Sequence, residues 1–172
     1  MIQNNLRFSS TPPFGAGEII IINYGAGNIQ SIMFAIERLG FKAILSSNPD
    51  EIKAADKVIF PGVGEASSAM KMLTSSGLDT LIPTLKQPVL YEEGITEGLG
   101  IFDVDVGKFS NKVKVSQMGW NNIYNLKSSL FKGIAENEYM YLVHSFYAPL
   151  CAEAIATTNY ELEYASALQK DN

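Results

Sequence analysis

The sequence predicts an α/β fold with an open, doubly wound and mostly parallel sheet, and three observations support this. Short apolar segments rich in β-branched residues alternate with segments whose apolar residues recur every three or four positions. Residues 19–22 are four consecutive isoleucines, as expected of a strand buried on both faces. The segments between residues 18 and 73 follow one another at the spacing of βαβ units.

The first half of the chain is expected to alternate strands with helices. A helix over residues 29–39 has a single apolar stripe, Asn28 as its N-cap and Gly40 as its end. A short helix then begins with Asn48 as its cap and Pro49 at its first position. The strands expected around these helices span residues 18–23, 42–45 and 57–60.

A second amphipathic helix is predicted after the third strand, with its apolar positions at Ala66, Ala69, Met70 and Leu73. Residues 87–90 then resemble another core strand, but the polar residues 91–94 follow at once. A parallel strand should lead into a crossover helix, so a crossover helix is expected to be missing at this point.

The second half is predicted to be rich in strands. Gly107, Asn121-Asn122 and Gly133 are expected to form the turns that separate them. The chain stops after a strand, where one more element is expected to close the sheet. We expect a flexible leader over residues 1–17 and a single, incomplete domain over residues 18–172. The expected strands span residues 100–109, 112–117, 139–147, 153–158 and 164–169.

Composition narrows the possible functions. The 172 residues carry a net charge of −5 and have a pI of about 4.9, which argues against nucleic-acid binding. The longest apolar run is too short to span a bilayer, and the basic residues are scattered, so we expect no membrane partner. One cysteine and one histidine exclude a disulfide framework and a Cys/His metal cluster within one chain. We therefore expect a cytoplasmic protein that uses no cofactor or metal.

Two glycine-rich turns follow expected strands. Gly25-Ala26-Gly27 resembles the start of a dinucleotide-binding fingerprint, but Gln30 replaces its third glycine, and a tight turn explains the two glycines alone. Pro61-Gly62-Val63-Gly64 could present backbone N–H groups to a developing anion. A second tight turn explains this segment equally well.

The chain has one possible thiol nucleophile and one histidine. Cys151 has neither a helix N-terminus nor a cation beside it in the sequence, so it is expected to be a small, partly buried hydrophobic residue. His144 lies in an apolar strand, where a hydrogen-bonded structural role is commoner than a role as a base. Because Ser145 is its direct neighbour on that strand, the two side chains should point to opposite faces and form no nucleophile–base pair.

For other polar and aromatic residues, solvent exposure or core packing is an alternative to a functional role. Asp103 and Asp105 are expected on one strand face, as are Glu161 and Glu163, and solvated faces are commoner than acid–base pairs. Trp120 is expected beside an amide-rich turn, either as a core anchor or as an aromatic residue that faces a partner.

Four motifs together resemble one family closely, the glutamine amidotransferase subunits of imidazole glycerol phosphate synthase, which are triad-type (class I) amidotransferases of histidine biosynthesis. The resemblance runs from about residue 18 to residue 172 and implies a flavodoxin-like domain docked on a (β/α)8-barrel cyclase. It implies that glutamine is hydrolysed and that its ammonia passes to the cyclase. The motifs are residues 22–28, 60–64, 118–121 and 143–147.

The resemblance also implies roles for single residues. Gly62, Val63 and Gly64 would form the oxyanion strand, whose amides stabilise the tetrahedral intermediate. The glutamine would be bound by Glu93, at its α-amino group, and by the backbone of Ser145 and Phe146. The residues expected to face the cyclase near the ammonia entrance are Asn23, Asn28, Met118 and Trp120.

The sequence departs from the family where the catalytic triad should be. The family continues after the position of Leu90 into a Gly-Ile-Cys-Leu-Gly-Met-Gln type elbow with the cysteine nucleophile, and later supplies a His-Pro-Glu segment; both are absent from these 172 residues. We therefore expect a glutaminase subunit that is inactive as it stands. The alternatives are a non-catalytic module that docks on the cyclase, a decayed relic of that subunit, or a flavin or nucleotide binder, which rests on the fold alone.

Overall fold

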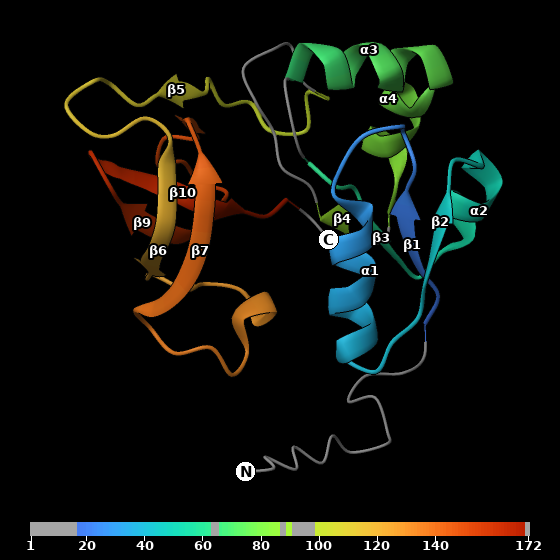
Figure 1. The fold of residues 1–172 in the computed structure, drawn as a ribbon, viewed down its shortest axis with the longest axis horizontal. Coiled ribbons are helices and arrows are strands. Elements are labelled where there is room, and N and C mark those ends of the chain that lie inside the picture. The colour runs from blue at the N-terminus through green and yellow to red at the C-terminus, as the bar shows by residue number, and fades with distance from the viewer. Residues whose placement is uncertain (1–16, 63–65, 87–88, 91–98, 171–172) are drawn as a thin grey trace, which may run out of the picture. The chain divides into compact units, whose positions relative to one another are not determined.

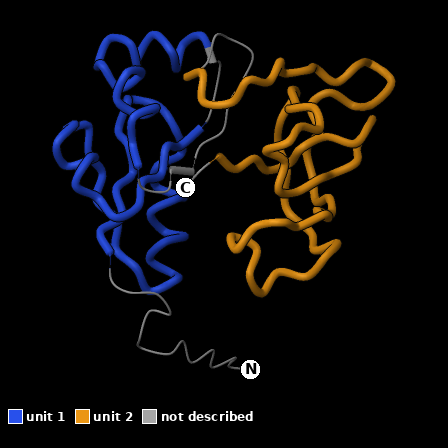
Figure 2. Tube along the Cα trace, turned by 180° about the vertical axis from the view of Figure 1, so that it is seen from behind, with its two compact units in different colours: residues 1–93 blue, residues 94–172 orange. Residues whose placement is uncertain are grey.

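The computed structural model describes residues 17–62, 66–86, 89–90 and 99–170 (Figure 1). The chain divides into two compact units, residues 1–93 and residues 94–172 (Figure 2). Apart from Gly17, the predicted leader lies outside the described residues.

The first unit is built around a parallel sheet with the strand order β2-β1-β3-β4. The chain passes from β1 to β2 on one side and then returns to β3 on the other side of β1. This is the flavodoxin-like order, and it confirms the predicted α/β fold. The strands are β1 (Ile19–Ile22), β2 (Ala43–Ser46), β3 (Lys57–Ile59) and β4 (Val89–Leu90).

Helices connect consecutive strands of this sheet, as the sequence predicts. The side chain of Asn28 caps α1 by accepting a hydrogen bond from the Ser31 N–H at 3.4 Å, and Gly40 ends the helix with φ of +84°. Asn48 caps α2 in the same way. The short helices α4 and η1 have no counterpart among the predicted elements. The helices are α1 (Ile29–Arg38), α2 (Pro49–Ala54), α3 (Ala66–Ser76), α4 (Leu78–Leu81) and η1 (Ile82–Thr84).

The core of the first unit is aliphatic. Ile20, Ile21 and Ile22 of β1 are fully buried because β1 lies between β2 and β3 and α2 packs against it. Ile52 of α2 and Leu73 of α3 are fully buried as well. The run of isoleucines therefore forms the centre of this unit, as expected for a strand with no solvent-facing side.

The second unit consists of antiparallel pairs, β6 with β7, β9 with β10 and β5 with β8. Tyr124 and Thr157 exchange backbone hydrogen bonds of 2.9 and 2.8 Å, and the Ala165 N–H donates to the Ala148 carbonyl at 2.9 Å, so the pairs are joined to one another. Its elements are β5 (Gly107–Lys108), β6 (Gln117–Ile123), η2 (Ser129–Phe131), β7 (Glu138–His144), β8 (Phe146–Tyr147), β9 (Ala154–Asn159) and β10 (Glu163–Leu168).

Several sequence predictions for the second unit are wrong. Residues 100–106 form no strand although their apolar residues alternate, and the run predicted over 112–117 is strand only at Gln117. Asp103 and Asp105 therefore share no strand face. Asn121-Asn122 lies inside β6 instead of forming a turn, and Ser145 interrupts the strand predicted over 139–147. The strands predicted over 153–158 and 164–169 are confirmed within one residue at each end.

None of the helices in the described part of the chain has the length and apolar character needed to cross a membrane.

Candidate functional site

The carboxyl ends of β1 and β3 form the switch point of the parallel sheet, where ligands of such folds usually bind. The Tyr24 hydroxyl, just after β1, donates a 2.7 Å hydrogen bond to the Pro61 carbonyl, just after β3. The Tyr24 ring also packs edge-on against Phe60, with 5.0 Å between the ring centroids. These contacts place the turn after β1 against the first residues of the Pro61-Gly62 segment.

The glycines after β1 are required by this packing. Gly25 and Gly27 have φ of +89° and +104°, which other residues rarely adopt. A Cβ atom added at Gly27 would lie 3.0 Å from the Pro61 Cβ. Both facts support the tight-turn explanation of Gly25-Ala26-Gly27.

The predicted oxyanion strand begins within the described residues. Gly62 is half-buried directly after Pro61, whereas Val63, Gly64 and the predicted glutamine-binding Glu93 lie outside the described residues. In the parallel pair of β3 and β4, Ile59 is the partner of Leu90. The carboxyl end of β4 therefore lies beside the strand that leads into Gly62.

The predicted interface residues of the first unit flank the same turn. Asn23 follows β1 directly, and its side chain accepts a 3.3 Å hydrogen bond from the Gly25 N–H. Asn28 is exposed, and its side-chain oxygen caps α1. The Asn23 amide thus stabilises the turn, and the Asn28 amide stabilises the start of α1.

In the second unit, Ser145 links β7 to β8, and Phe146 is the first residue of β8. The Phe109 N–H donates to the Ser145 carbonyl at 3.1 Å, and the hydroxyls of Ser145 and Ser116 lie 2.5 Å apart. The Lys108 ammonium lies 5.5 Å from the centroid of the Phe146 ring. One backbone hydrogen bond and two side-chain contacts therefore hold these two residues in place.

Both ring nitrogens of His144 are engaged in hydrogen bonds. Nδ1 lies 2.7 Å from the Phe146 carbonyl oxygen, and Nε2 lies 3.1 Å from the Tyr164 hydroxyl. The predicted hydrogen bonding of this histidine is confirmed, and its structural role stays a prediction.

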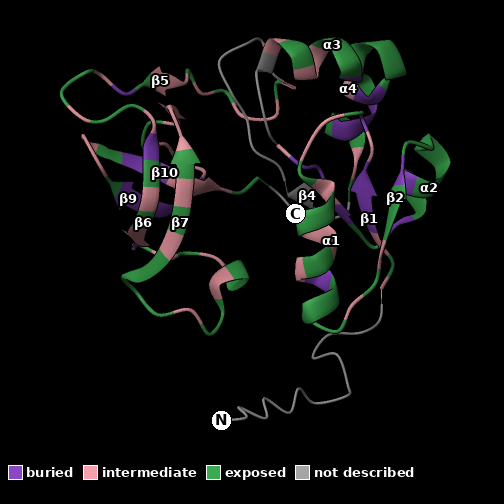
Figure 3. Ribbon diagram, in the orientation of Figure 1, coloured by how far each residue is buried: buried purple, intermediate pink, exposed green. Residues whose placement is uncertain are grey.

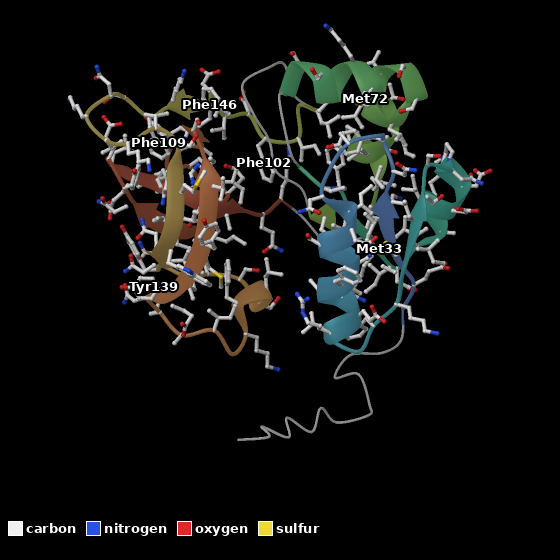
Figure 4. The ribbon with its side chains drawn as sticks, viewed as in Figure 1. Met33, Met72, Phe102, Phe109, Tyr139 and Phe146 are labelled. Carbon is white, nitrogen blue, oxygen red and sulfur yellow. The ribbon has the colours of Figure 1, made fainter. Side chains whose placement is uncertain are left out.

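A group of aromatic rings around Phe109 was not found from the sequence. Phe109 and Tyr164 are both buried, and Figure 4 shows Phe109 and Phe146 at the end of the unit where β5 and β8 pair. Since these residues are distant in sequence, no local spacing indicated them. The rings in contact with Phe109 belong to His144, Tyr147, Tyr160 and Tyr164, with centroid distances of 5.5, 4.9, 5.3 and 5.6 Å.

Exposed residues occur along both β6 and β7 (Figure 3), and the exposed apolar ones among them lie on one face of the hairpin. Trp120 is 69% exposed and packs edge-on against its cross-strand partner Tyr141, with 5.6 Å between the ring centroids. Trp120 is therefore no core anchor of this unit. We call this set the hairpin face; its members are Met118, Trp120, Tyr139, Tyr141 and Val143.

Cys151 has the surroundings of an unreactive thiol. It is partly exposed and precedes the turn before β9. Partial burial, together with the neighbouring Glu153 carboxylate, raises its pKa above the ordinary value. A raised pKa leaves little of the nucleophilic thiolate at neutral pH.

The predicted carboxylate pairs, Asp103 with Asp105 and Glu161 with Glu163, have different surroundings. Asp103 and Asp105 are exposed, and Glu163 accepts a hydrogen bond from the Tyr124 hydroxyl. Glu161 accepts hydrogen bonds from the Ser110 hydroxyl and N–H at 2.5 and 2.7 Å, which lower its pKa. Among the described residues, no three His, Cys, Asp or Glu side chains gather as a metal site would require.

Comparison with known proteins shows clear relatives, although no family model matches the chain. It is 46% identical over 170 residues to the imidazole glycerol phosphate synthase subunit HisH of Bacteroides fragilis, covering 90% of this chain and 87% of the relative. It is 41% identical over 167 residues to the same subunit of Methanosarcina mazei, covering 87% of this chain and 83% of that relative.

Among solved structures, a glutamine amidotransferase from Thermotoga maritima matches with a TM-score of 0.57 and 14% identity, covering 88% of this chain and 70% of the other. At that identity the likeness shows the fold alone.

Proposed function

Since the chain belongs to the family of the imidazole glycerol phosphate synthase subunit HisH, we propose that it takes the place of the glutamine-hydrolysing subunit in that synthase of histidine biosynthesis. We propose further that it docks on the (β/α)8-barrel cyclase in the cytoplasm, binds glutamine, and does not hydrolyse glutamine by itself.

The proposal of inactivity rests on the pairing of β3 with β4. Ile59 and Leu90 are partners, so the end of β4 lies beside the strand that leads to Gly62. In the family, the elbow with the nucleophilic cysteine starts at the end of this strand, within reach of the oxyanion amides of Gly62, Val63 and Gly64. This chain has Tyr91-Glu92-Glu93 there instead of a cysteine.

The alignment with the Bacteroides fragilis relative supports a deletion inside the chain. It extends over 170 residues, whereas 90% of this 172-residue chain is about 155 residues. About 15 aligned positions of the relative therefore have no counterpart in this chain. That number is close to the dozen or so residues expected for the missing elbow and its helix.

Cys151 does not replace the missing nucleophile in this proposal. It is the only cysteine of the chain, and its raised pKa disfavours the thiolate. The only imidazole is that of His144, which is hydrogen-bonded through both ring nitrogens. Neither group has the properties of a nucleophile–base pair.

The proposed glutamine contacts at Ser145 and Phe146 agree with the strand geometry. The Phe109 N–H bonds to the Ser145 carbonyl, and bonded and non-bonded pairs alternate along an antiparallel ladder. The next pair, Lys108 with Phe146, is therefore a non-bonded one, and the N–H of Phe146 faces away from β5. An amide in that orientation can donate to a ligand. Glu93 would bind the α-amino group of the glutamine.

The hairpin face is the surface of the second unit that best suits the cyclase. Exposed aromatic residues are enriched in interfaces, and Trp120 and Tyr141 already support each other across the two strands. Met118 and Trp120 would contact the cyclase from this face, and Asn23 and Asn28 from the first unit.

A glutaminase assay tests the proposal. The purified chain, with an intact mass of 18.8 kDa, is mixed with the cyclase and its nucleotide ligand, and glutamate release from glutamine is measured. We expect stable complex formation and no glutamate above the background without enzyme. Complete HisH from Bacteroides fragilis serves as the active control.

The variant Cys151→Ala separates the possible outcomes. Glutamate release that is lost in this variant would identify Cys151 as a nucleophile and overturn the proposed inactivity. Failure to bind the cyclase would instead favour a relic that no longer assembles.

A further inference from the structure

A series of hydrogen bonds extends from Gln117 on β6 through Tyr164 on β10 and His144 on β7 to the backbone of Phe146. As placed, the Tyr164 hydroxyl donates to Gln117 Oε1 at 2.9 Å, lies 3.1 Å from His144 Nε2, and also bonds the Thr158 side chain. His144 Nδ1 lies 2.7 Å from the Phe146 carbonyl oxygen. Because Gln117 and Tyr164 are buried, each of these groups depends on its protein partners.

The direction of the bonds follows from what each atom can donate. A carbonyl oxygen only accepts, so Nδ1 of His144 must carry a proton to bond with Phe146. In a neutral imidazole, Nε2 is then an acceptor, and the Tyr164 hydroxyl is the donor beside it. Tyr164 thereby selects the tautomer that reaches Phe146.

Gln117 can donate a hydrogen bond to Tyr164 when its side-chain amide is rotated by half a turn. As placed, its Nε2 atom is buried without a partner among the described residues. Exchanging the amide nitrogen and oxygen lets the NH2 group donate to the Tyr164 oxygen, whose own proton goes to His144. After this exchange the buried atom without a partner is the Gln117 side-chain oxygen instead of its nitrogen. A buried carbonyl oxygen without a partner costs less free energy than a buried N–H without one.

Ring packing fixes the orientation of the imidazole. The Tyr164 and His144 rings meet edge-on at 5.3 Å, and Phe109 packs 5.5 Å from His144. The imidazole therefore cannot rotate freely, and its proton decides whether the Phe146 carbonyl is bonded.

We propose that Tyr164 is a positioning residue: its hydroxyl holds His144 in the Nδ1–H tautomer, which fixes the Phe146 carbonyl and orients the neighbouring backbone for glutamine. The effect on glutamine rests on the proposed function, while the effect on His144 and Phe146 is a property of the second unit alone. The role needs the hydroxyl and not the ring, so Tyr164→Phe removes it with little change in packing.

Nuclear magnetic resonance of the full chain tests the hydrogen bonds directly, because His144 is the only histidine. The ring nitrogens are observed in long-range ¹⁵N–¹H spectra at alkaline pH, and the Phe146 carbonyl through a ¹³C label. We expect the Nδ1–H tautomer in the unaltered chain. In Tyr164→Phe we expect a mixture of tautomers and a Phe146 carbonyl signal shifted towards that of a weaker hydrogen bond.

Tyr160→Phe is the matched control. Tyr160 also contacts the Phe109 ring, but its hydroxyl donates to the Lys114 carbonyl at 2.8 Å and has no bond to His144. The control should leave the tautomer and the Phe146 signal unchanged. An Nε2–H tautomer in the unaltered chain, or equal spectra for Tyr164→Phe and the unaltered chain, would overturn the proposal.

Glutamine titration of the complex with the cyclase gives the functional readout. We expect Tyr164→Phe to raise the Kd for glutamine about three- to tenfold, the range covered by one ordinary hydrogen bond, and Tyr160→Phe to leave it unchanged. An unaltered chain that binds no glutamine would refute glutamine binding in the proposed function, while the spectra would still decide the role of Tyr164. An unchanged Kd in Tyr164→Phe would refute its effect on glutamine.

Discussion

The hydroxyl of Tyr24 donates a 2.7 Å hydrogen bond to the carbonyl oxygen of Pro61. Tyr24 follows β1 and Pro61 follows β3, so the bond joins the ends of two neighbouring parallel strands. Gly62 comes next in the chain, and the bond therefore fixes where the proposed oxyanion strand begins.

Replacing Tyr24 with Phe should lower the free energy of unfolding by about 1–2 kcal/mol. The ring and its packing against Phe60 remain, but a buried carbonyl loses its donor. Denaturant unfolding followed by circular dichroism measures the change. A free energy equal to that of the unaltered chain would mean that water replaces the hydroxyl.

Replacing Gly27 with Ala should destabilise the protein more than replacing Gly40 with Ala. Both glycines have positive φ, so both variants carry backbone strain of about 1 kcal/mol or more. Only at Gly27 would the added Cβ also meet the Pro61 ring, whereas space is open around Gly40. Equal changes in denaturation midpoint would show that the turn after β1 can move away from Pro61.

Replacing Ile21 with Ala should cost about 2–5 kcal/mol, the range for a large residue truncated in a core. Ile21 is 0% exposed on the central strand of its sheet, whereas Ile44 on the neighbouring strand is 48% exposed. Ile44→Ala is therefore the control, and less than half of that loss is expected for it. Thermal unfolding of the two variants side by side measures the difference.

Replacing Trp120 with Ala should weaken binding to the cyclase by about tenfold or more, as expected for an aromatic residue at the centre of an interface. The change in stability should be small because Trp120 is 69% exposed. Leu130, which is 62% exposed in η2 and outside the hairpin face, provides the control Leu130→Ala. Equal affinities of both variants, measured by titration calorimetry, would refute docking through this face.

Replacing Glu161 with Gln should flatten the dependence of stability on pH in the acid range. The Ser110 hydroxyl and N–H lower the pKa of Glu161 from its ordinary value of 4.5 in the folded chain. A lowered folded pKa gives stability that is present above the ordinary value and is lost as the pH falls through the folded one. Unfolding curves recorded from neutral pH down through this range measure the slope.

Ser110→Ala serves as the partner variant for that measurement, because it removes one of the two bonds to Glu161. Its effect and that of Glu161→Gln should not add in the double variant. Full additivity would show that the two residues act independently.

The parallel half of the fold could be predicted from the sequence because local signals decide it. The isoleucines of residues 19–22 need burial on both faces, and Asn28, Gly40, Asn48 and Pro49 mark helix ends through their own backbone and side-chain bonds. In the antiparallel half, local signals mislead. Residues 100–106 alternate like a strand but pair with none of the described strands.

Without the family resemblance, local signals indicate the candidate site only where it lies on turns. Gly27 and Gly62 stand out in the sequence as members of glycine-rich segments. The bonds among Gln117, His144 and Tyr164 join residues far apart in the chain, and no spacing rule connects them. Asn121 and Asn122 resemble a turn by composition, but Asn121 donates to the Asn159 carbonyl and Asn122 to the Asn137 side chain, so tertiary partners keep them in a strand.

The hairpin of β6 and β7 has apolar residues on its exposed face as well as on its buried face. A shift of the pairing by one residue would exchange the two faces, and burial alone would penalise that exchange weakly. The amides of Asn121 and Asn122 bond to fixed partners on opposite sides of β6, and a shifted strand could keep neither bond. Asn121 and Asn122, whose composition resembles a turn, therefore fix the pairing register of β6 with β7. This register keeps the Trp120 side chain on the exposed face of the hairpin.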